Sequence, residues 1–284
     1  MSTFDPTLLA SLPQFSILSA QPLTGGLSNR CWALKLQDNA KGRIIKAVWR
    51  PVSKSSQAFG ISRQHEHHIL QQLHCDQIAP STIALLEQGL LVEWIEGSVV
   101  DEATDNALTD NDLLQIQAEI HSLPVPAWRL DAKSRAAHYW QFIPSKFKSL
   151  QLEQIHQSFQ QQKEVSWFTD TCCHHDLGRY NIVCQPDGIK RVIDWEYAAA
   201  GDPSFDLALT VCANELDVSF AVSAYCQRQG YSDVQRWQQA VQYWLPWCDY
   251  LAMLWYYVGA GLWPEPSYLD EARTLQKKLA TFSE

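Results

Sequence analysis

The spacing of hydrophobic and polar residues changes near residue 100 and divides the chain into two predicted parts. Before this point, short apolar runs separated by turns predict strands over residues 31–34, 44–49, 82–87 and 90–95. Ile69, Leu70 and Leu73 have helical spacing, which predicts one helix over residues 62–74. We therefore expect residues 1–96 to form a small mixed-sheet lobe with one helix.

The second part shows mainly helical spacing. One helix is indicated by Leu113, Ile116, Ile120 and Leu123, and further helices are expected over residues 134–163, 204–229, 231–244 and 248–282. Two short strands, at residues 182–184 and 191–194, are predicted on either side of the turn at Pro186-Asp187-Gly188. We expect residues 97–284 to form a larger, mainly helical lobe, which makes the fold α+β with two lobes.

Composition and charge narrow the classes of function. The 284 residues are 46% hydrophobic and 19% charged, as in ordinary globular proteins. The net charge is −9, from 22 Lys and Arg against 31 Asp and Glu. With no tract of Lys and Arg, this charge argues against a nucleic-acid partner and against a basic face on an anionic membrane. It is compatible with a small cationic ligand.

Three features bear on the compartment. The first twenty residues have no basic region followed by an apolar run, so we expect no secretory signal. The apolar stretch over residues 244–263 contains Pro246 and Asp249, which favours a buried aromatic helix over a membrane span. The eight cysteines show no C-x-x-C spacing and are expected to be reduced thiols. We therefore expect a cytoplasmic protein.

The residues that carry chemistry stand in H-H-D-L-G-R-Y-N (174–181) and I-D-W-E-Y (193–197). Asp176 and Asn181 lie five residues apart in a loop that opens into the predicted hairpin, and Asp194 ends the returning strand. Phosphoryl transfer uses this set: one carboxylate accepts the proton of the attacking hydroxyl, while an amide oxygen and a second carboxylate bind Mg²⁺. The hairpin is expected to bring Asn181 and Asp194 together.

These two motifs resemble the catalytic and metal motifs of the aminoglycoside phosphotransferase and choline kinase superfamily, which has a protein-kinase-like fold. The resemblance implies that Asp176 is the catalytic base and that Asn181 and Asp194 are magnesium ligands. It further implies that His174 and Asp206 brace the catalytic loop. A two-lobed kinase fold, with ATP and Mg²⁺ as cofactors, is the expectation that follows.

The N-terminal part resembles members of this superfamily in four places, three of which are similar to choline kinases. The hinge-like segment 92–97 includes Glu93 and Ile95, whose backbone would bind the purine. The segments V-W-R-P and I-S-R-Q-H-E imply that Arg50 binds phosphate and that Glu66 pairs with it, with Lys46 as the alternative cation. A glycine turn similar to the phosphate-covering turn of these kinases contains Gly25, Gly26, Ser28 and Asn29.

The C-terminal part of the sequence narrows the choice of acceptor substrate. Choline kinases have E-Y after the metal Asp, as here, and the C-terminal helices are rich in aromatic residues that can hold a cation. However, Val258 occupies the second position of the choline-binding W-x-x-W pair that Trp255 begins, and the tail resembles that of bacterial thiamine kinases. Tyr197, Trp255 and Asp249 are the candidate wall residues for either cation.

We expect an ATP-dependent kinase of a small cationic alcohol of the choline or ethanolamine type, with thiamine as the alternative acceptor. An aminoglycoside-type phosphotransferase and a catalytically silent nucleotide-binding module are further alternatives. The nucleotide-binding lobe would be residues 1–96, and residues 97–284 would bind the acceptor. The oligomeric state and the choice between ATP and GTP are left open by the sequence.

Overall fold

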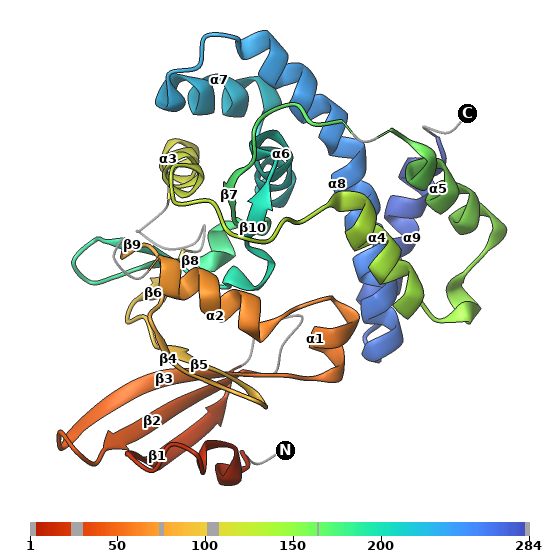
Figure 1. Ribbon diagram of the computed structural model, residues 1–284. Coiled ribbons are helices and arrows are strands. Elements are labelled where there is room, and N and C mark those ends of the chain that lie inside the picture. Colours follow the sequence, from red (N-terminus) through yellow and green to blue (C-terminus); the bar gives the residue numbers. More distant parts are fainter. Residues whose placement is uncertain (1–3, 24–30, 74–76, 101–107, 164, 282–284) are drawn as a thin grey trace. The chain divides into compact units, whose positions relative to one another are not determined.

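The chain divides into two units, and the computed structural model describes residues 4–23, 31–73, 77–100, 108–163 and 165–281 (Figure 1). The sheet unit comprises residues 1–57, 61–98 and 183–196. The helical unit comprises residues 58–60, 99–182 and 197–284. Residues 183–196, which the sequence placed with the C-terminal lobe, therefore pack with the sheet unit. The functional assignment of the two parts stays a prediction.

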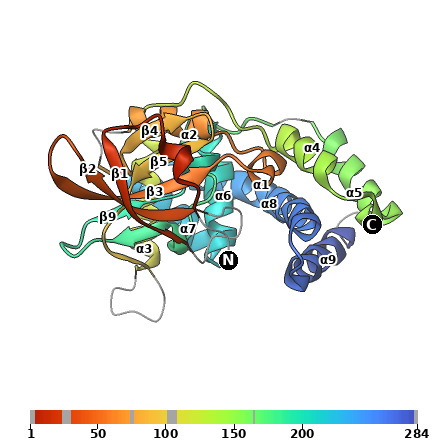
Figure 2. The same cartoon turned by 90° about the horizontal axis from the view of Figure 1, so that it is seen from below.

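The sheet unit is built on five antiparallel strands in the order β1-β2-β3-β5-β4 (Figure 2). Alternating apolar residues point to one face, where Leu34, Leu36, Ala47, Trp49 and Leu91 form a buried core. Helix α2 contacts β4 and β5, and the Ser62 hydroxyl caps its first turn. The bounds are Pro6–Leu9 (η1), Phe15–Pro22 (β1), Trp32–Asp38 (β2), Arg43–Pro51 (β3), Lys54–Ala58 (α1), Arg63–Gln72 (α2), Thr82–Leu86 (β4) and Gly89–Glu93 (β5).

The predicted hairpin near residue 187 is confirmed. Strand β8 (Ile182–Cys184) and strand β9 (Lys190–Val192) flank a turn in which the Gly188 N–H donates to the Gln185 carbonyl at 2.9 Å. Gly188 has a φ of 87°, a conformation that glycine adopts without strain. The short strand β6 (Ser98–Val99), which the sequence did not predict, completes a sheet in the order β6-β8-β9.

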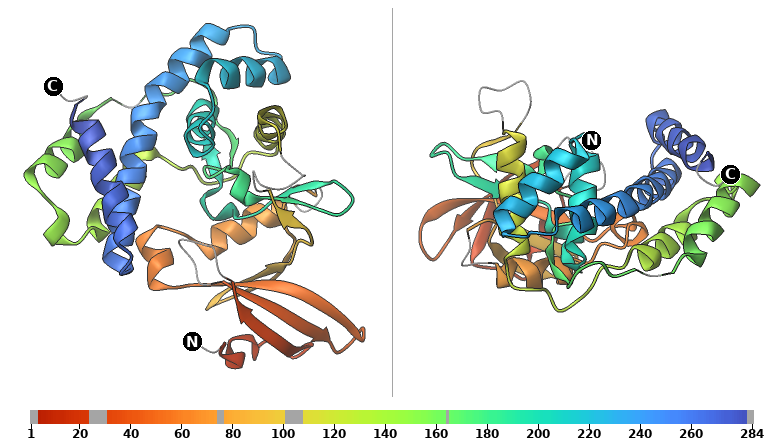
Figure 3. Two further views of the ribbon diagram at one scale, coloured as in Figure 1. Left: turned by 180° about the vertical axis from the view of Figure 1, so that it is seen from behind. Right: turned by 90° about the horizontal axis from the view of Figure 1, so that it is seen from above.

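The helical unit is organised around the long helix α8, with α9 beside its C-terminal part (Figure 3). Helices α4, α6 and α7 also contact α8. Two short antiparallel strands, β7 (Thr171–Cys173) and β10 (Ala199–Gly201), lie between the helical segments in sequence. The remaining bounds are Asp110–His121 (α3), Ala132–Phe142 (α4), Ser145–Phe147 (η2), Leu150–Gln161 (α5), Arg179–Asn181 (η3), Trp195–Tyr197 (η4), Pro203–Ala213 (α6), Val218–Gln229 (α7), Val234–Leu262 (α8) and Pro266–Ala280 (α9).

Prolines account for most of the differences between predicted and observed helices. The helix expected over residues 134–163 is two helices, because Pro144 interrupts it. By contrast, α8 continues through Pro246, where the buried rings of Trp244 and Trp247 supply packing that offsets the lost hydrogen bond. Helix α8 ends at Leu262, and the capping residue Trp263 precedes Pro264.

The helix expected over residues 204–229 is also two helices, and here polar capping residues make the break. Asn214 ends α6, and the Asp217 carboxylate accepts the Phe220 N–H at 2.7 Å to start α7. Asp233 begins α8 in the same way, accepting the Arg236 N–H at 3.0 Å. Side-chain capping thus sets these helix boundaries, although the hydrophobic spacing alone predicts one continuous helix over residues 204–229.

The described helices include none with the length and apolar character needed to cross a membrane. Helix α8 is 29 residues long, but it carries Asp249 and the polar residues of its first turns. The adjacent Cys172 and Cys173 lie fully buried in β7 as free thiols, in agreement with the expectation of reduced cysteines.

Candidate active site

The loop that follows β7 contains Asp176, and other residues of the same loop donate hydrogen bonds to its carboxylate. Asn181 Nδ2 donates to the Asp176 carbonyl at 2.9 Å and to its Oδ2 at 3.2 Å. The Tyr180 hydroxyl donates to Oδ1 of the same carboxylate at 2.7 Å. The helical unit therefore brings Asp176 and Asn181 together and adds Tyr180, to which sequence reasoning gave no role.

The loop is fixed from outside by polar contacts. Asn214 accepts the Arg179 N–H at 3.0 Å through Oδ1 and donates to the Leu177 carbonyl at 3.0 Å through Nδ2. The Arg179 guanidinium pairs with Asp110, the first residue of α3. Backbone and side chain of Arg179 are thus both held, which restricts the residues on either side.

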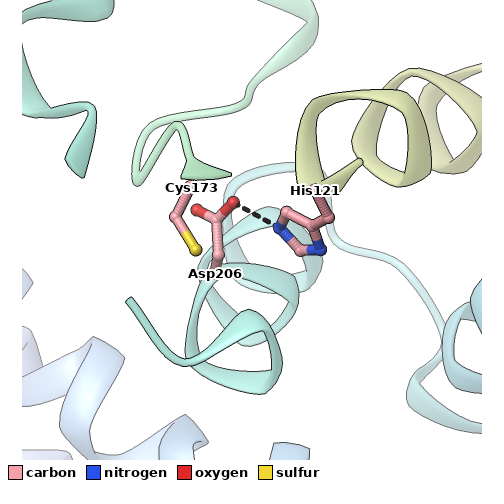
Figure 4. A group of neighbouring side chains, drawn as sticks. All are labelled: His121, Cys173 and Asp206. Carbon is pink, nitrogen blue, oxygen red and sulfur yellow. Dashed lines mark hydrogen bonds and ion pairs between the residues drawn. The ribbon is translucent and has the colours of Figure 1, made fainter. Parts of the chain in front are cut away.

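Asp206, in the first turn of α6, holds the residues that precede Asp176. Its Oδ1 accepts the His175 N–H at 2.6 Å, and its Oδ2 accepts the His174 N–H at 3.2 Å. Its Oδ2 also accepts from Gln117 at 3.0 Å. The same oxygen accepts from His121 at 2.8 Å (Figure 4). Burial alone would raise the pKa of Asp206, but the His121 hydrogen bond and the nearby histidines hold it well below its usual range. These are the contacts of a residue that braces the loop.

His121, Cys173 and Asp206 place their ligand atoms within 4.8 Å of one another, as a metal site would require (Figure 4). Each group already has a protein partner, since His121 Nδ1 lies 2.7 Å from the Tyr225 hydroxyl and Cys173 Sγ donates to the Gly201 carbonyl at 3.3 Å. Burial raises the pKa of the Cys173 thiol well above its usual value, so the sulfur keeps its proton. We interpret the group as a hydrogen-bonded core.

His175 lies buried beside this core with a φ of 60°. Burial lowers its pKa from 6.5 to about 4. Between these values the unfolded chain binds a proton that the folded chain does not, so the free energy of unfolding falls as the pH drops from 6.5 towards 4. Asn also tolerates a positive φ, which makes His175→Asn a suitable variant.

We expect the His175→Asn variant to lose about 3 kcal/mol less unfolding free energy than the wild type between pH 7 and pH 4. Urea unfolding of both proteins at the two pH values measures this difference. Equal losses in the two proteins would contradict the assignment of a neutral, buried His175.

Five charged side chains meet in the sheet unit. Arg50 Nε lies 2.7 Å from Glu66 Oε1, and its Nη2 contacts Asp194 and lies 2.8 Å from Glu196 Oε2. Arg63 Nη1 lies 2.6 Å from Glu66 Oε2 and 3.0 Å from Glu196 Oε2. The predicted ion pair between Arg50 and Glu66 is confirmed, and it belongs to a larger network.

This network contains two basic and three acidic groups, so full ionisation leaves one excess negative charge. Burial, followed by the charge of Asp194, raises the pKa of Glu196 to about 7. Protonation of Glu196 would balance the charges near neutral pH. Removing either arginine would leave acidic groups buried without compensation, which is strongly unfavourable.

The other predicted nucleotide residues are less distinctive. Lys46 is half exposed and pairs with Glu96 at 2.5 Å. Glu93 ends β5, and its N–H donates to the Ser81 carbonyl at 2.8 Å, so this N–H already has a partner. Ile95 is buried. The nucleotide-binding role of these residues stays a prediction, as does that of four residues outside the described part of the chain, namely Gly25, Gly26, Ser28 and Asn29.

Tyr197, expected to face a cationic acceptor, already has a cation over its ring. The Arg135 guanidinium carbon lies 4.9 Å from the centroid of the Tyr197 ring. Arg135 is held there by a 2.7 Å hydrogen bond from Nη1 to the Phe59 carbonyl. One face of the Tyr197 ring is therefore occupied by a charge of the protein itself.

The two other wall candidates both lie in helix α8 and also have partners within the protein. Asp249 Oδ2 lies 2.7 Å from Lys278 Nζ, and its side chain is 17% exposed. Trp255 stacks on Phe59 with ring centroids 4.9 Å apart. The negative charge of Asp249 is thus matched by Lys278, which weakens its case as a partner for a cationic acceptor.

Sequence reasoning missed several residues of these networks. Arg63 and Glu196 stand inside the R-Q-x-E and I-D-W-E-Y segments, so their position in a motif was a usable signal. His121 and Arg135 stand in predicted helices with no motif around them, and their roles follow only from tertiary contacts. Asp194 belongs to the sheet unit, whereas Asp176 and Asn181 belong to the helical unit. A shared magnesium site for these residues stays a prediction.

Comparison with known proteins gives a consistent family. Residues 19–265 match the model of the phosphotransferase enzyme family. Thiamine kinase of Escherichia coli O157:H7 is 27% identical over 254 residues, which cover 89% of this chain and 87% of that protein. The AMP complex of choline kinase LicA from Streptococcus pneumoniae has a similar fold, with a TM-score of 0.76 at 20% identity, over 96% of each chain.

The gentamicin complex of APH(2'')-IIa also shares the fold, with a TM-score of 0.66 at 13% identity over 97% of each chain. These likenesses confirm the expected α+β, kinase-like fold. The family match spans most of the chain and includes the whole segment that contains the two motifs. The chain is therefore a small-molecule kinase that belongs to the phosphotransferase enzyme family.

Proposed function

We propose that this kinase transfers the γ-phosphate of ATP to the hydroxyl of a small organic cation, with Asp176 as the general base. The observation that supports it is the Asp176 carboxylate, which is oriented by Asn181 and Tyr180 on a braced loop. The acceptor oxygen bonds to the γ-phosphorus, and the bond from that phosphorus to the bridging oxygen of ADP breaks. The hydroxyl proton passes to Asp176.

Magnesium would be held by Asn181 and Asp194, whose donor atoms suit this ion. Asn181 donates through its amide nitrogen, which leaves the amide oxygen as the atom for a cation. The Asp194 side chain is 29% exposed and offers a carboxylate. Carboxylate and amide oxygens are ligands that Mg²⁺ prefers, and the ion would neutralise charge on the nucleotide phosphates. Arg50, in contact with Asp194, would add a positive charge towards phosphate.

Replacing Asp194 by Ala is expected to raise the dissociation constant of MgATP at least tenfold, because a magnesium ligand is removed. Arg50 keeps Glu66 and Glu196 as partners in this variant. Calorimetry with and without Mg²⁺ measures the effect, and the loss is expected only with the ion. Asp187 is an exposed residue of the β8–β9 turn, and Asp187→Ala is the matched control. Unchanged MgATP binding in Asp194→Ala would count against the metal role.

Thiamine is our leading candidate for the acceptor. The similarity to a thiamine kinase extends over nearly the whole chain, and the tail W-L-P-W agrees with that branch. Arg135 over the Tyr197 ring argues against placing the cationic centre of either acceptor on that face, because two like charges would be brought together. Thiamine has a primary hydroxyl and flat rings, so it can use aromatic surface away from Tyr197.

Choline is the second candidate, on the strength of the E-Y pair after Asp194 and the Arg50–Glu66 pair. An aminoglycoside is a polycation and would call for many acidic groups, whereas the candidate wall is mainly aromatic and Asp249 is neutralised by Lys278. The silent nucleotide-binding module is disfavoured by the presence of Asp176, Asn181 and Asp194 together.

The deciding experiment is ADP release by the purified protein with MgATP, across thiamine, choline, ethanolamine, homoserine and kanamycin. We expect release that depends on thiamine and is absent in Asp176→Asn. Release with choline or kanamycin alone would assign the other acceptor. Tight ATP binding without acceptor-dependent release on a wider panel of alcohols would favour the silent module.

A further inference from the structure

Tyr180 lies against the proposed base, and its effect on the rate of the reaction is a question separate from the identity of the base. The residue is 51% exposed, yet its hydroxyl donates to Asp176 Oδ1 at 2.7 Å. A hydrogen bond from a neutral hydroxyl to a carboxylate is stronger than one between two neutral groups. An exposed tyrosine has many solvent-facing rotamers, so this orientation calls for a structural cause.

Gly178 provides one cause, because the Tyr180 ring lies directly over it. A Cβ atom at position 178 would stand 2.1 Å from Cε1 and 2.3 Å from Cζ of Tyr180. Real carbon atoms do not approach so closely, so only glycine leaves space for the ring in this position. Gly178 has a φ of −105°, which any residue can adopt, so its backbone conformation does not explain the glycine.

The turn on which Tyr180 stands is also held at both ends. The Asn181 N–H donates to the Gly178 carbonyl at 2.9 Å and closes the turn of η3. Arg179 is fixed by Asn214 and Asp110, as described above. The Cα atom of Tyr180 is thereby placed, and the ring over Gly178 directs the hydroxyl to Asp176.

We propose that Tyr180 is a positioning residue for the phosphoryl transfer: its hydroxyl fixes Oδ1 of Asp176, while Asn181 fixes Oδ2. The proposal rests on the proposed function of Asp176 as base. A carboxylate oxygen has room for two hydrogen bonds, so Oδ1 can keep Tyr180 and still accept from an acceptor hydroxyl. Holding both oxygens selects one rotation of the carboxylate, which lowers the cost of aligning it with the acceptor.

The test is steady-state kinetics of Tyr180→Phe beside the wild type and Asp176→Asn, on the acceptor that the panel identifies. Phe keeps the ring over Gly178 and loses only the hydroxyl. We expect kcat to fall about tenfold, the effect of losing a hydrogen bond to a charged group. The KM values for MgATP and for the acceptor are expected to change less than twofold. Unchanged KM values would show that the acceptor and nucleotide sites are intact.

Tyr231→Phe is the matched control, since Tyr231 is a 40% exposed phenol of the same unit that stacks on Trp237. Its kcat and melting temperature are expected to equal those of the wild type. A Tyr180→Phe enzyme with wild-type kcat, beside an inactive Asp176→Asn, would overturn the positioning role and leave the proposed function standing. An active Asp176→Asn enzyme would overturn both.

Discussion

Replacing Asp176 by Asn is expected to lower kcat by roughly a thousandfold, the scale of a lost general base. Asn has the shape of Asp, so its oxygen can still accept from Tyr180, as Asp176 Oδ1 does at 2.7 Å. It cannot take the proton of the acceptor hydroxyl, and the negative charge that attracts this proton is gone. Single-turnover measurement of phosphorylated product gives the chemical step directly.

Nucleotide binding serves as the internal control for this variant. The residues proposed to bind phosphate and metal, Arg50, Asn181 and Asp194, are unchanged in this variant, and Asn181 can still donate to the backbone carbonyl of residue 176. The dissociation constant of MgATP is therefore expected to stay within about twofold. Asp187→Asn removes an exposed carboxylate of the β8–β9 turn and should leave kcat unchanged. An Asp176→Asn enzyme with more than a tenth of wild-type turnover would refute the assignment of the base.

The fold was largely predictable because hydrophobic spacing records which face of each element is buried. The alternation over residues 44–49 corresponds to β3, where Ala47 and Trp49 are buried and Lys46 is exposed. Breaks that depend on single residues were harder to place. Pro144 and Pro246 have the same chemistry, yet only Pro144 ends a helix, because the packing around Trp244 and Trp247 decides the outcome.

The site was predictable where chemistry is confined to a motif. Asp176, Asn181 and Asp194 could be named because phosphoryl transfer requires those groups at that spacing. Their supports could not be named, since they come from distant positions: His121 is 85 residues from Asp206, and Arg63 is 133 residues from Glu196. Pairings of this kind depend on tertiary packing, which a local pattern does not contain.

The predicted acceptor-binding residues show a different limit of sequence-based prediction. Tyr197 was selected because aromatic rings bind cations, and the ring does bind one, but the cation is Arg135. Sequence could not show this, because Arg135 lies 62 positions away in helix α4 and carries no motif. The residue type of Tyr197 therefore predicted a contact between its ring and a cation, but it did not predict which cation makes that contact.

The buried carboxylate of Asp206 is the other position where a single change is expected to have a large effect. Asp206→Asn should lower the free energy of unfolding by about 3 kcal/mol, since four donors share this carboxylate and an amide can serve fewer of them. The side-chain NH₂ group that this substitution introduces would also face these N–H donors and would lack a hydrogen-bond acceptor among them. Urea unfolding measures the loss, and Asp217→Asn is the control, because Asn caps α7 as well as Asp does.

The Asp206 variant should also lose activity, because the N–H groups of His174 and His175 anchor the residues before Asp176. The pKa of Asp206 is held below the ordinary value of 3.8, so the carboxylate stabilises the folded chain fully above that pH and progressively less as the pH falls below it. The stability gap between wild type and Asp206→Asn should therefore narrow in acid, whereas a purely steric effect would leave it constant. A gap that stays constant from pH 7 to pH 3, or a loss below about 1 kcal/mol at pH 7, would contradict the bracing role.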